Sequence, residues 1–271
     1  MSIALVTGAS AGIGLSVARK LAAGGWRVAL VARTERTLRE AAAMLPAGAA
    51  EIFPCDVGDL AACAALPSRV AARMGGLDAL VNNAGFHRRG PLLEVDPRDL
   101  AAMVTVNLAA PVVLTRAAAE LMPTGSRIVN VASLAGMVPM RLQATYGATK
   151  MGLRAFSRAA RDELSPRGIT VSVVSPGPVD TGFFGEELER VADIAFSQPM
   201  SSADQVADAV LTCIREGTPE IALPWLSGKL CTLGYLSPGL ARLLRPGLER
   251  RGARNKAAYI RRKRAAGPNA T

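Results

Sequence analysis

The chain has 271 residues, half of them hydrophobic and a fifth charged, with a formal net charge of +10. This length suits one large α/β domain, and the composition excludes wholesale disorder. No apolar run approaches the roughly 20 residues of a membrane-spanning helix. The sequence enters a predicted strand at once, which leaves no room for a signal peptide.

The cysteines and the single histidine limit the kinds of disulfide, metal site and catalytic triad that the chain can form. Cys55, Cys63, Cys213 and Cys231 are scattered and form no C-x-x-C pair. They predict buried thiols in a reducing, cytoplasmic compartment rather than disulfides. His87 is the single histidine, so we expect neither a metal site nor a histidine-based triad.

The excess charge is confined to the C-terminal end. Residues 1–228 contain 21 basic and 21 acidic residues, whereas residues 229–271 contain 11 basic residues and one acid, Glu249. The difference in the second part, 11 minus 1, is the whole net charge of +10. The main part of the chain is therefore neutral, and the high pI describes the tail.

Strands and helices are predicted to alternate. Apolar runs predict buried strands at Ile3–Thr7, Arg27–Ala32, Ala50–Phe53, Ala79–Val81, Arg127–Val131, Thr170–Val174 and Glu220–Leu223. Helical patterns occupy Leu15–Leu21, Thr34–Met44, Leu60–Met74, Pro97–Leu121, Thr145–Ser165 and Ala203–Arg215. This alternation is typical of a doubly wound Rossmann-type α/β fold, with a seven-stranded parallel sheet and helices on both faces. We assign residues 1–224 to a dinucleotide-binding and catalytic domain, and residues 225–271 to an apolar and basic helical extension.

A glycine-rich turn follows the first strand, in the run Thr7-Gly-Ala-Ser-Ala-Gly-Ile-Gly14. Glycine permits unusual backbone angles, and the lack of a Cβ lets a phosphate reach the helix N-terminus. A tight structural bend is the alternative. The strand before the turn and the helix after it favour phosphate binding.

Polar residues also follow the next three strands, where ligands bind in such sheets. Arg33 stands where enzymes that prefer NAD usually have an acid, so it favours a 2′-phosphate and NADP(H). The alternative is a solvated arginine at the start of a helix. Asp56 can accept a hydrogen bond from an adenine amino group, and Gly85 lets the backbone approach a ribose. Either residue could instead serve ordinary turn chemistry.

Tyr146 and Lys150 lie four residues apart and share one face of a predicted helix. Tyrosine has a pKa of about 10, too high for acid–base work at neutral pH. A neighbouring ammonium stabilises the phenolate and lowers that pKa, which general acid–base catalysis requires. Ser133, after the fifth strand, can hold a substrate oxygen. A surface lysine on an amphipathic helix is the alternative for this pair alone.

The motifs taken together closely resemble the short-chain dehydrogenase/reductase family over about residues 1–225. The resemblance rests on the glycine turn, on Asn82-Asn83-Ala84-Gly85, on Ser133 and on Tyr146-x-x-x-Lys150, in this order. It implies a nicotinamide cofactor and a catalytic tetrad of Asn107, Ser133, Tyr146 and Lys150. In the family, this asparagine perturbs its helix and anchors a water in a proton relay. The implied cofactor-binding residues are Gly8, Ser10, Ala11, Gly12, Ile13, Gly14, Arg33, Asp56, Val57, Asn83, Ala84, Gly85, Tyr146, Lys150, Pro176, Gly177, Val179 and Thr181.

The family builds its substrate pocket from segments that correspond to residues 86–95, 134–142 and 182–200. The second segment is almost wholly apolar and the third opens with Phe183 and Phe184, which favours a lipophilic substrate. Packing against the domain or a second subunit is the alternative. Glu186, Glu187 and Glu189 suit the outer face of a mobile lid helix. A solvated loop is expected for residues 87–89, although they could meet an anionic group.

We therefore predict an NADP(H)-dependent oxidoreductase that interconverts a secondary alcohol and a ketone, on a 3-keto acyl, keto-lipid or steroid-like substrate. The resemblance implies a homodimer or homotetramer. Two alternatives stay open: a non-catalytic NADP(H)-binding regulator or scaffold, and an epimerase or dehydratase that uses the same residues.

The C-terminal extension has its own pattern. An apolar series from Trp225 to Leu244 precedes a basic segment at residues 249–264. Short apolar helices followed by basic residues suit a peripheral anchor on an anionic membrane. Packing across an oligomer interface and a solvated basic end are the competing interpretations. The tail contains no recognition motif, so we expect no nucleic-acid partner.

Overall fold

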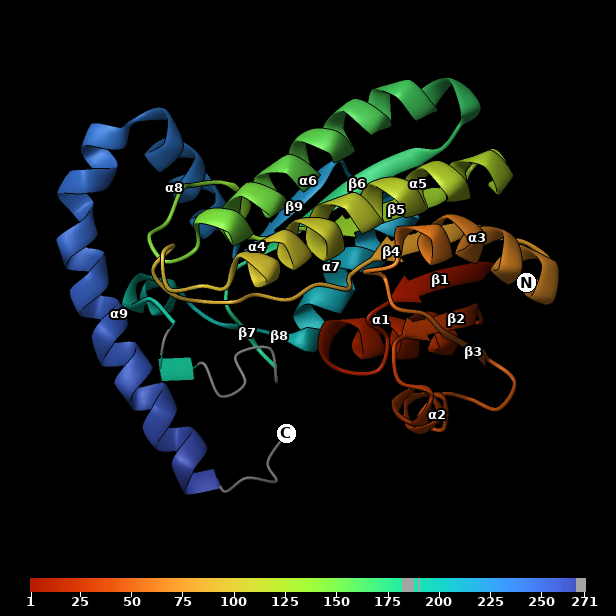
Figure 1. Cartoon of the computed structure of the whole chain (residues 1–271), viewed down its shortest axis with the longest axis horizontal. Helices are drawn as coiled ribbons and strands as arrows, with labels where there is room; N and C mark the ends of the chain where they lie inside the picture. The colour runs from red at the N-terminus through yellow and green to blue at the C-terminus, as the bar shows by residue number, and fades with distance from the viewer. Residues whose placement is uncertain (182–187, 190, 267–271) are drawn as a thin grey trace.

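A seven-stranded parallel sheet forms the centre of the computed structural model, which describes residues 1–181, 188–189 and 191–266 (Figure 1). The strand order is β3-β2-β1-β4-β5-β6-β9, so the chain reverses direction across the sheet between β1 and β4. The strands are β1 Ile3–Thr7, β2 Arg27–Ala32, β3 Ala50–Pro54, β4 Ala79–Asn82, β5 Arg127–Val131, β6 Thr170–Pro176 and β9 Glu220–Leu223. All seven predicted strands are confirmed. A short parallel pair, β7 Val179–Asp180 and β8 Ser201–Ser202, was not predicted.

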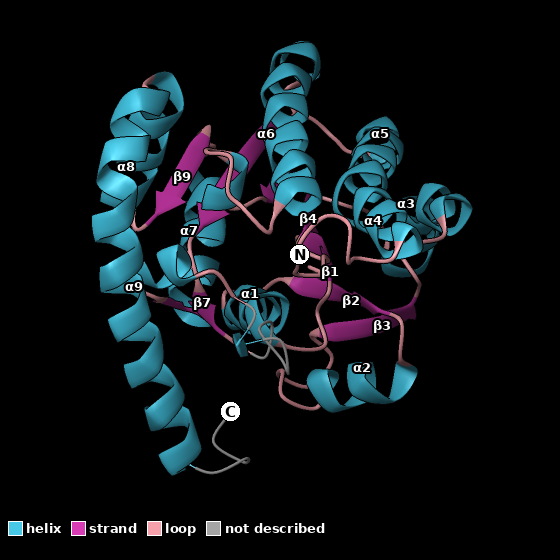
Figure 2. Ribbon diagram, turned by 60° about the vertical axis from the view of Figure 1, so that its left-hand side comes forward, coloured by secondary structure: helices cyan, strands magenta, loops and turns pink. Residues whose placement is uncertain are grey.

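Helices cover both faces of the sheet, as the doubly wound fold requires (Figure 2). The helices α1, α2 and α7 lie on one face, and α3, α5 and α6 lie on the other. Their bounds are α1 Gly12–Ala23, α2 Glu35–Ala42, α3 Leu60–Met74, α4 Pro97–Val104, α5 Ala110–Leu121, α6 Ala144–Leu164 and α7 Ala203–Glu216. The predicted helices are confirmed with small shifts at their ends.

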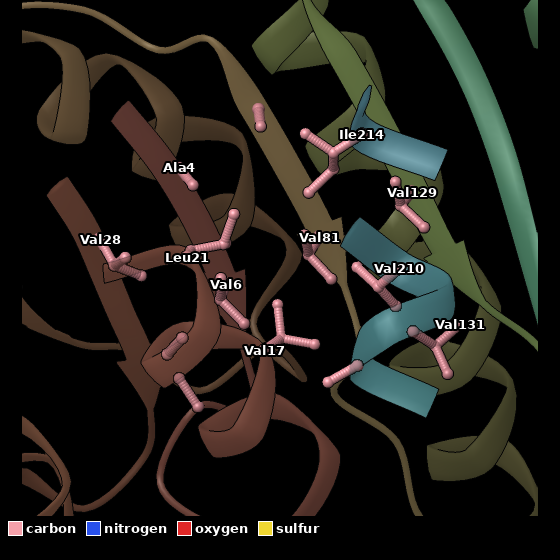
Figure 3. Close-up of a cluster of buried hydrophobic side chains, with 14 of the residues drawn as sticks. Ala4, Val6, Val17, Leu21, Val28, Val81, Val129, Val131, Val210 and Ile214 are labelled. Atoms are coloured by element: carbon pink, nitrogen blue, oxygen red, sulfur yellow. The ribbon is translucent and has the colours of Figure 1, made fainter. Parts of the chain in front are cut away.

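Successive side chains of a strand point to opposite faces of the sheet, and helices cover both faces, so the inner strands are buried on both sides, whereas the edge strands β3 and β9 are half-buried. On β1, Ala4 and Val6 join one core cluster, whereas Ile3 and Leu5 join the other. Figure 3 shows the first cluster, in which Val6 lies among side chains of β4, α1 and α7. Each fully buried aliphatic side chain stabilises the fold by about 1.5–3 kcal/mol, which explains the near-continuous apolar strand sequences.

The predicted helix at 97–121 is interrupted by one π-helical turn, Thr105–Ala109. By length and composition alone this segment is long and apolar enough to cross a membrane, so the expectation that no apolar run is long enough is wrong. In the structure the segment contacts α3 and α6 and belongs to the helical layer on the sheet.

Two helices form the C-terminal extension, α8 Trp225–Leu236 and α9 Pro238–Ala266. The second is one helix of 29 residues rather than a short one. It runs down one side of the molecule (Figure 1) and contacts the 3₁₀ segment Asp193–Ser197 that follows β7. The division of the chain at residue 224 stays a prediction.

Candidate active site

A cavity of about 440 Å³ opens at the carboxyl ends of β1, β4, β5 and β6. It lies where the strand order reverses, the place at which open α/β sheets bind ligands. The structure brings most of the predicted site residues to its wall: Gly8, Ala11, Gly12, Ile13, Asn83, Ala84, Gly85, Ser133, Tyr146, Lys150, Pro176, Gly177, Val179 and Thr181. Six predicted residues do not line it: Ser10, Gly14, Arg33, Asp56, Val57 and Asn107.

The glycine turn has the geometry that the sequence suggested. Gly8 and Gly12 have positive φ angles of 66° and 55°. A Cβ on Gly14 would lie 2.6 Å from Nδ2 of Asn83 and would also overlap the carbonyl oxygen of Gly8. The first turn of α1 carries no acid, and its N-cap is an alanine. The helix N-terminus therefore faces the cavity without a side chain that could compete with a phosphate.

Hydrogen bonds hold the ends of β1 and β4 together beside this turn. The hydroxyl of Thr7 accepts from the backbone N–H groups of Asn83 and Ala84, both at 3.0 Å. The Asn83 amide donates to the Thr7 carbonyl oxygen at 2.9 Å. These bonds fix the Asn83–Ala84–Gly85 backbone against the cavity.

The residues proposed for the adenosine end lie after β2 and β3. Arg33 is exposed and stands one residue beyond β2. Asp56 accepts a hydrogen bond from the Gly58 N–H at 2.9 Å, which is the turn role left open above. Val57 is buried.

Asn107 lies in the π-helical turn and is fully buried. Its side chain forms a reciprocal pair with the backbone of Phe86: Oδ1 accepts from the Phe86 N–H at 3.0 Å, and Nδ2 donates to the Phe86 carbonyl at 2.8 Å. A Cβ on Gly85 would lie 2.9 Å from this Oδ1 and 3.5 Å from Nζ of Lys150. Asn107 thus links the loop after β4 to the π-helical turn, next to Lys150.

Ser133, Tyr146 and Lys150 form one polar wall of the cavity. Tyr146 and Lys150 share the inward face of α6, with Nζ 5.9 Å from the centre of the Tyr146 ring. Lys150 donates to the Val131 carbonyl oxygen at 2.9 Å. The Ser133 and Tyr146 side chains are hydrogen-bonded, and Ser133 also accepts from the Ala135 N–H at 3.1 Å.

Burial shifts both ionisable groups of this wall toward their neutral forms. Burial raises the pKa of Tyr146, whereas the hydrogen bond with Ser133 and the charge of Arg89 act to lower it. Burial lowers the pKa of Lys150 to about 8. The Tyr146 phenol is therefore protonated at neutral pH, as a proton donor must be.

The loop after β4 corrects one expectation. His87 and Arg89 are 7% and 6% exposed and line the cavity, so this loop is not simply solvated. Arg88 is exposed and pairs with Asp99 at 3.4 Å. Burial alternates along residues 87–89, but three successive polar residues, His-Arg-Arg, carry no apolar pattern in the sequence that could have separated residues 87 and 89 from Arg88.

The segment after β7 closes the cavity on the side of α8 and α9. Val191, Ala195 and Gln198 line it, and so does Cys231 of α8, a free thiol that is half-buried rather than buried as predicted. The predicted pocket residues Phe183 and Phe184 and the predicted lid residues Glu186 and Glu187 lie outside the described residues. Glu189 is described and exposed.

The second half of α9 holds this segment in place. Asn255 donates to the Phe196 carbonyl at 2.9 Å. Lys256 donates to the carbonyls of Glu189 and Val191, both at 2.7 Å. The Tyr259 hydroxyl donates to Asp180 at 2.6 Å, directly beside Thr181. Part of the basic tail is thus used within the fold rather than left in solvent.

Comparison with known proteins agrees with this geometry. The family model for short chain dehydrogenases matches residues 2–192. The chain belongs to the short-chain dehydrogenase/reductase family. The ketoacyl reductase HetN of a Nostoc species is 34% identical over 248 residues, which cover 86% of this chain and 84% of that protein. L-2,3-butanediol dehydrogenase of Corynebacterium glutamicum is 31% identical over 225 residues, which cover 80% and 87%.

A solved structure supports the fold as well. The crystal structure of a short chain dehydrogenase from Burkholderia cenocepacia in complex with NADP has a TM-score of 0.74 to this chain. The two are 34% identical, and the match covers 82% of this chain and 95% of that one. Membership of the short-chain dehydrogenase/reductase family makes this protein an NAD(P)-dependent oxidoreductase with a Rossmann-type fold.

Proposed function

We propose that this protein is an NADP(H)-dependent oxidoreductase that interconverts a secondary alcohol and a ketone on a lipophilic substrate. The single observation that carries the proposal is the polar wall of Ser133, Tyr146 and Lys150, which shares one cavity with the glycine turn. A proton donor and a phosphate cradle on the same cavity fit a carbonyl reductase better than a sensor, which would need only the cradle.

The residues present fit a nicotinamide dinucleotide. The glycine turn and the N-terminus of α1 would hold the pyrophosphate, and Gly85 leaves room for a ribose beside Lys150. A Cβ on Gly12 would lie 3.5 Å from Thr181, so the loop after β6 reaches back to the turn and can cover the nicotinamide. When bound, this cofactor supplies or accepts the hydride.

The protein's own residues then manage the substrate oxygen and its proton. Tyr146 donates its proton to the carbonyl oxygen during reduction and takes it back during oxidation. Ser133 hydrogen-bonds the same oxygen. The Lys150 ammonium stabilises the Tyr146 phenolate that forms and binds the ribose. Asn107 supports the proton relay by fixing the loop that faces Lys150.

Two observations support the choice of NADP(H). Arg33 is exposed at the end of β2, where its guanidinium is free to reach a 2′-phosphate. The similar protein from Burkholderia cenocepacia was crystallised with NADP. We also propose that Asp56 and Val57 contact the adenine of the cofactor.

The lining of the cavity supports a lipophilic substrate. Beyond the polar wall much of it is formed by apolar side chains, among them Leu134, Ala135, Met140 and Val191, with His87, Arg89 and Gln143 as polar members. The similarity to a ketoacyl reductase is consistent with a 3-keto acyl compound, and a keto-lipid or steroid-like ketone suits the same surface.

NADPH oxidation over a panel of carbonyl compounds tests this function. Wild-type protein is expected to consume NADPH with 3-keto acyl and long-chain keto substrates. Tyr146→Phe should bind NADPH normally, measured by cofactor fluorescence, and lose at least about 100-fold in kcat, the usual contribution of general acid catalysis. Substantial turnover by Tyr146→Phe would refute the role of Tyr146. Substrate conversion without net NADPH consumption would indicate the epimerase or dehydratase alternative.

We further propose that the protein assembles as a homodimer or homotetramer and that its C-terminal extension docks on an anionic membrane surface. Exposed apolar side chains on α8 support the membrane proposal, among them Trp225, Leu226 and Leu230, at 68%, 54% and 54% exposure. Lys229 on the same helix and Arg242 on α9 are exposed as well. Because Cys231 of α8 lines the cavity, a surface bound there would lie next to the substrate entrance.

A further inference from the structure

His87 carries a hydrogen-bonding atom that the chemistry described so far does not use. It is 93% buried, lines the cavity and comes from the loop after β4. Its Nε2 has no hydrogen-bond partner among the described residues. A buried polar atom without a partner costs about 1–3 kcal/mol, so its presence in a ligand cavity calls for an explanation.

The ring of His87 is stacked on the ring of Tyr146. The two ring centres lie 4.2 Å apart and the ring planes differ by 13°. The imidazole is therefore held nearly parallel to the ring of the proposed proton donor, on the wall of the same cavity. Of the other residues that line the cavity, Leu134 and Met140 offer no side-chain hydrogen bonds, whereas Arg89, Gln143 and Gln198 carry polar side chains.

The protonation state of His87 fixes what it can recognise. Burial, together with the nearby charge of Arg89, lowers its pKa to about 3. The imidazole is neutral at physiological pH, so it offers one N–H donor and one acceptor rather than a cation. A neutral imidazole suits a carbonyl or hydroxyl oxygen, not a carboxylate that demands a positive charge.

We infer that His87 binds a second oxygen of the substrate, close to the carbonyl that Tyr146 serves. The preferred substrate is then a lipophilic ketone with a neighbouring carbonyl or hydroxyl group, such as a 3-keto ester, a 3-keto thioester or a diketone. A ketone with a single oxygen would leave Nε2 unpaired in the bound state. This inference rests on the proposed function, because it names the substrate class of the same site.

The experiment crosses two variants with two substrates. Ethyl 3-oxohexanoate has the second oxygen, and 4-nonanone is an alkyl ketone of similar length without it. His87→Phe keeps an aromatic ring on Tyr146 and removes both nitrogens, whereas His87→Gln keeps a hydrogen-bonding group and removes the ring. The measurements are kcat/KM for each substrate with NADPH, and the dissociation constant of NADPH as a control.

His87→Phe is expected to lower kcat/KM for the keto ester by about 10- to 100-fold, since sites built to hydrogen-bond a substrate group discriminate strongly once the bond is lost. Its kcat/KM for 4-nonanone should change less than about threefold, and NADPH binding should not change. His87→Gln should recover part of the loss on the keto ester.

Equal losses on both substrates would overturn the inference, because they would show that His87 acts only by packing on Tyr146. A kcat/KM for the keto ester that stays unchanged in His87→Phe would overturn it too. If wild-type protein reduced no carbonyl in the panel, the proposed function itself would fail, and the inference with it.

Discussion

Lys150 and Tyr146 lie one turn apart on α6, and burial acts on the two side chains in opposite directions. The pKa of the tyrosine rises and that of the lysine falls to about 8, because each loses solvation of its charged form. The spacing of Tyr146 and Lys150 predicted a lowered tyrosine pKa. In the free protein, burial opposes that effect and raises the tyrosine pKa. In the free protein the result is a protonated phenol beside an ammonium that is lost at mildly alkaline pH.

The first prediction concerns pH. Lysine is charged below its pKa, so a value lowered from 10.5 to about 8 brings the loss of the ammonium into the measurable range. We expect kcat/KM for NADPH, which reports on the free enzyme, to fall as pH rises through about 8. The measurement is this parameter from pH 6 to pH 10 at saturating carbonyl substrate.

Lys150→Arg is the matched control, because a guanidinium keeps its charge at every pH tested. Whatever activity this variant retains should show no fall near pH 8. A wild-type profile that stays flat to pH 10, or the same fall in Lys150→Arg, would contradict the assignment.

A second residue-scale prediction concerns cofactor preference. Arg33→Ala is expected to lower kcat/KM for NADPH by roughly tenfold or more and to leave NADH within about threefold, since a charge-assisted hydrogen bond contributes about 1.5–3 kcal/mol. Arg36→Ala is the control, because Arg36 is paired with Glu40 in the same region. Equal losses with both cofactors in Arg33→Ala would rule out a 2′-phosphate contact.

At the scale of elements, α9 acts as a brace on the segment that lines the cavity. Gly252 is buried where the helix crosses this segment, and a Cβ there would overlap the carbonyl oxygen of Asp193. Gly247 lies five residues earlier in the same helix, and a Cβ there would have no neighbour within 4 Å. An alanine at Gly247 therefore changes helix propensity alone, whereas an alanine at Gly252 also changes packing against Asp193.

This pair gives the third prediction. Gly252→Ala should destabilise the protein by about 1–3 kcal/mol, the usual cost of overpacking, and raise KM for the carbonyl substrate by moving Val191 and Ala195. Gly247→Ala should stabilise it by about 0.5–1 kcal/mol without a change in KM. Urea unfolding and steady-state kinetics measure both effects. An unchanged KM in Gly252→Ala would show that α9 does not position the cavity wall.

The elements also show how far the sequence can be interpreted. The inner strands were predictable because they are buried on both faces and therefore almost continuously apolar, as in Ala79–Val81, and the half-buried edge strands β3 and β9 still carry short apolar runs. The π-helical turn at Asn107 has no such pattern, and only the family resemblance pointed to it. The contacts of Tyr259 with Asp180 join positions 79 residues apart, which no local pattern encodes. His87 was wrongly predicted to lie in a solvated loop for a related reason, since its burial depends on α6 packing against that loop.

At the scale of the whole molecule, charge and exposed apolar surface are both concentrated in the extension. Beyond residue 228 basic residues outnumber acids by 11 to one. Leu226, Leu230 and Leu233 are 54%, 54% and 47% exposed and lie at helical spacing on one face of α8. An exposed apolar face flanked by cations is the arrangement that peripheral membrane helices use.

The last prediction follows from this arrangement. In flotation with vesicles of phosphatidylcholine and 30% phosphatidylserine, wild-type protein should float, whereas the triple variant Leu226→Ser, Leu230→Ser, Leu233→Ser should stay at the bottom. Leu121→Ser, an equally exposed leucine on α5, is the control and should float like wild type. Raising the salt to 1 M should release wild-type protein, because the screening length falls to about 3 Å. Equal recovery on pure phosphatidylcholine, or flotation of the triple variant, would contradict the membrane proposal. A fall in molar mass of the triple variant by light scattering would instead identify this face as a contact between two copies of the chain.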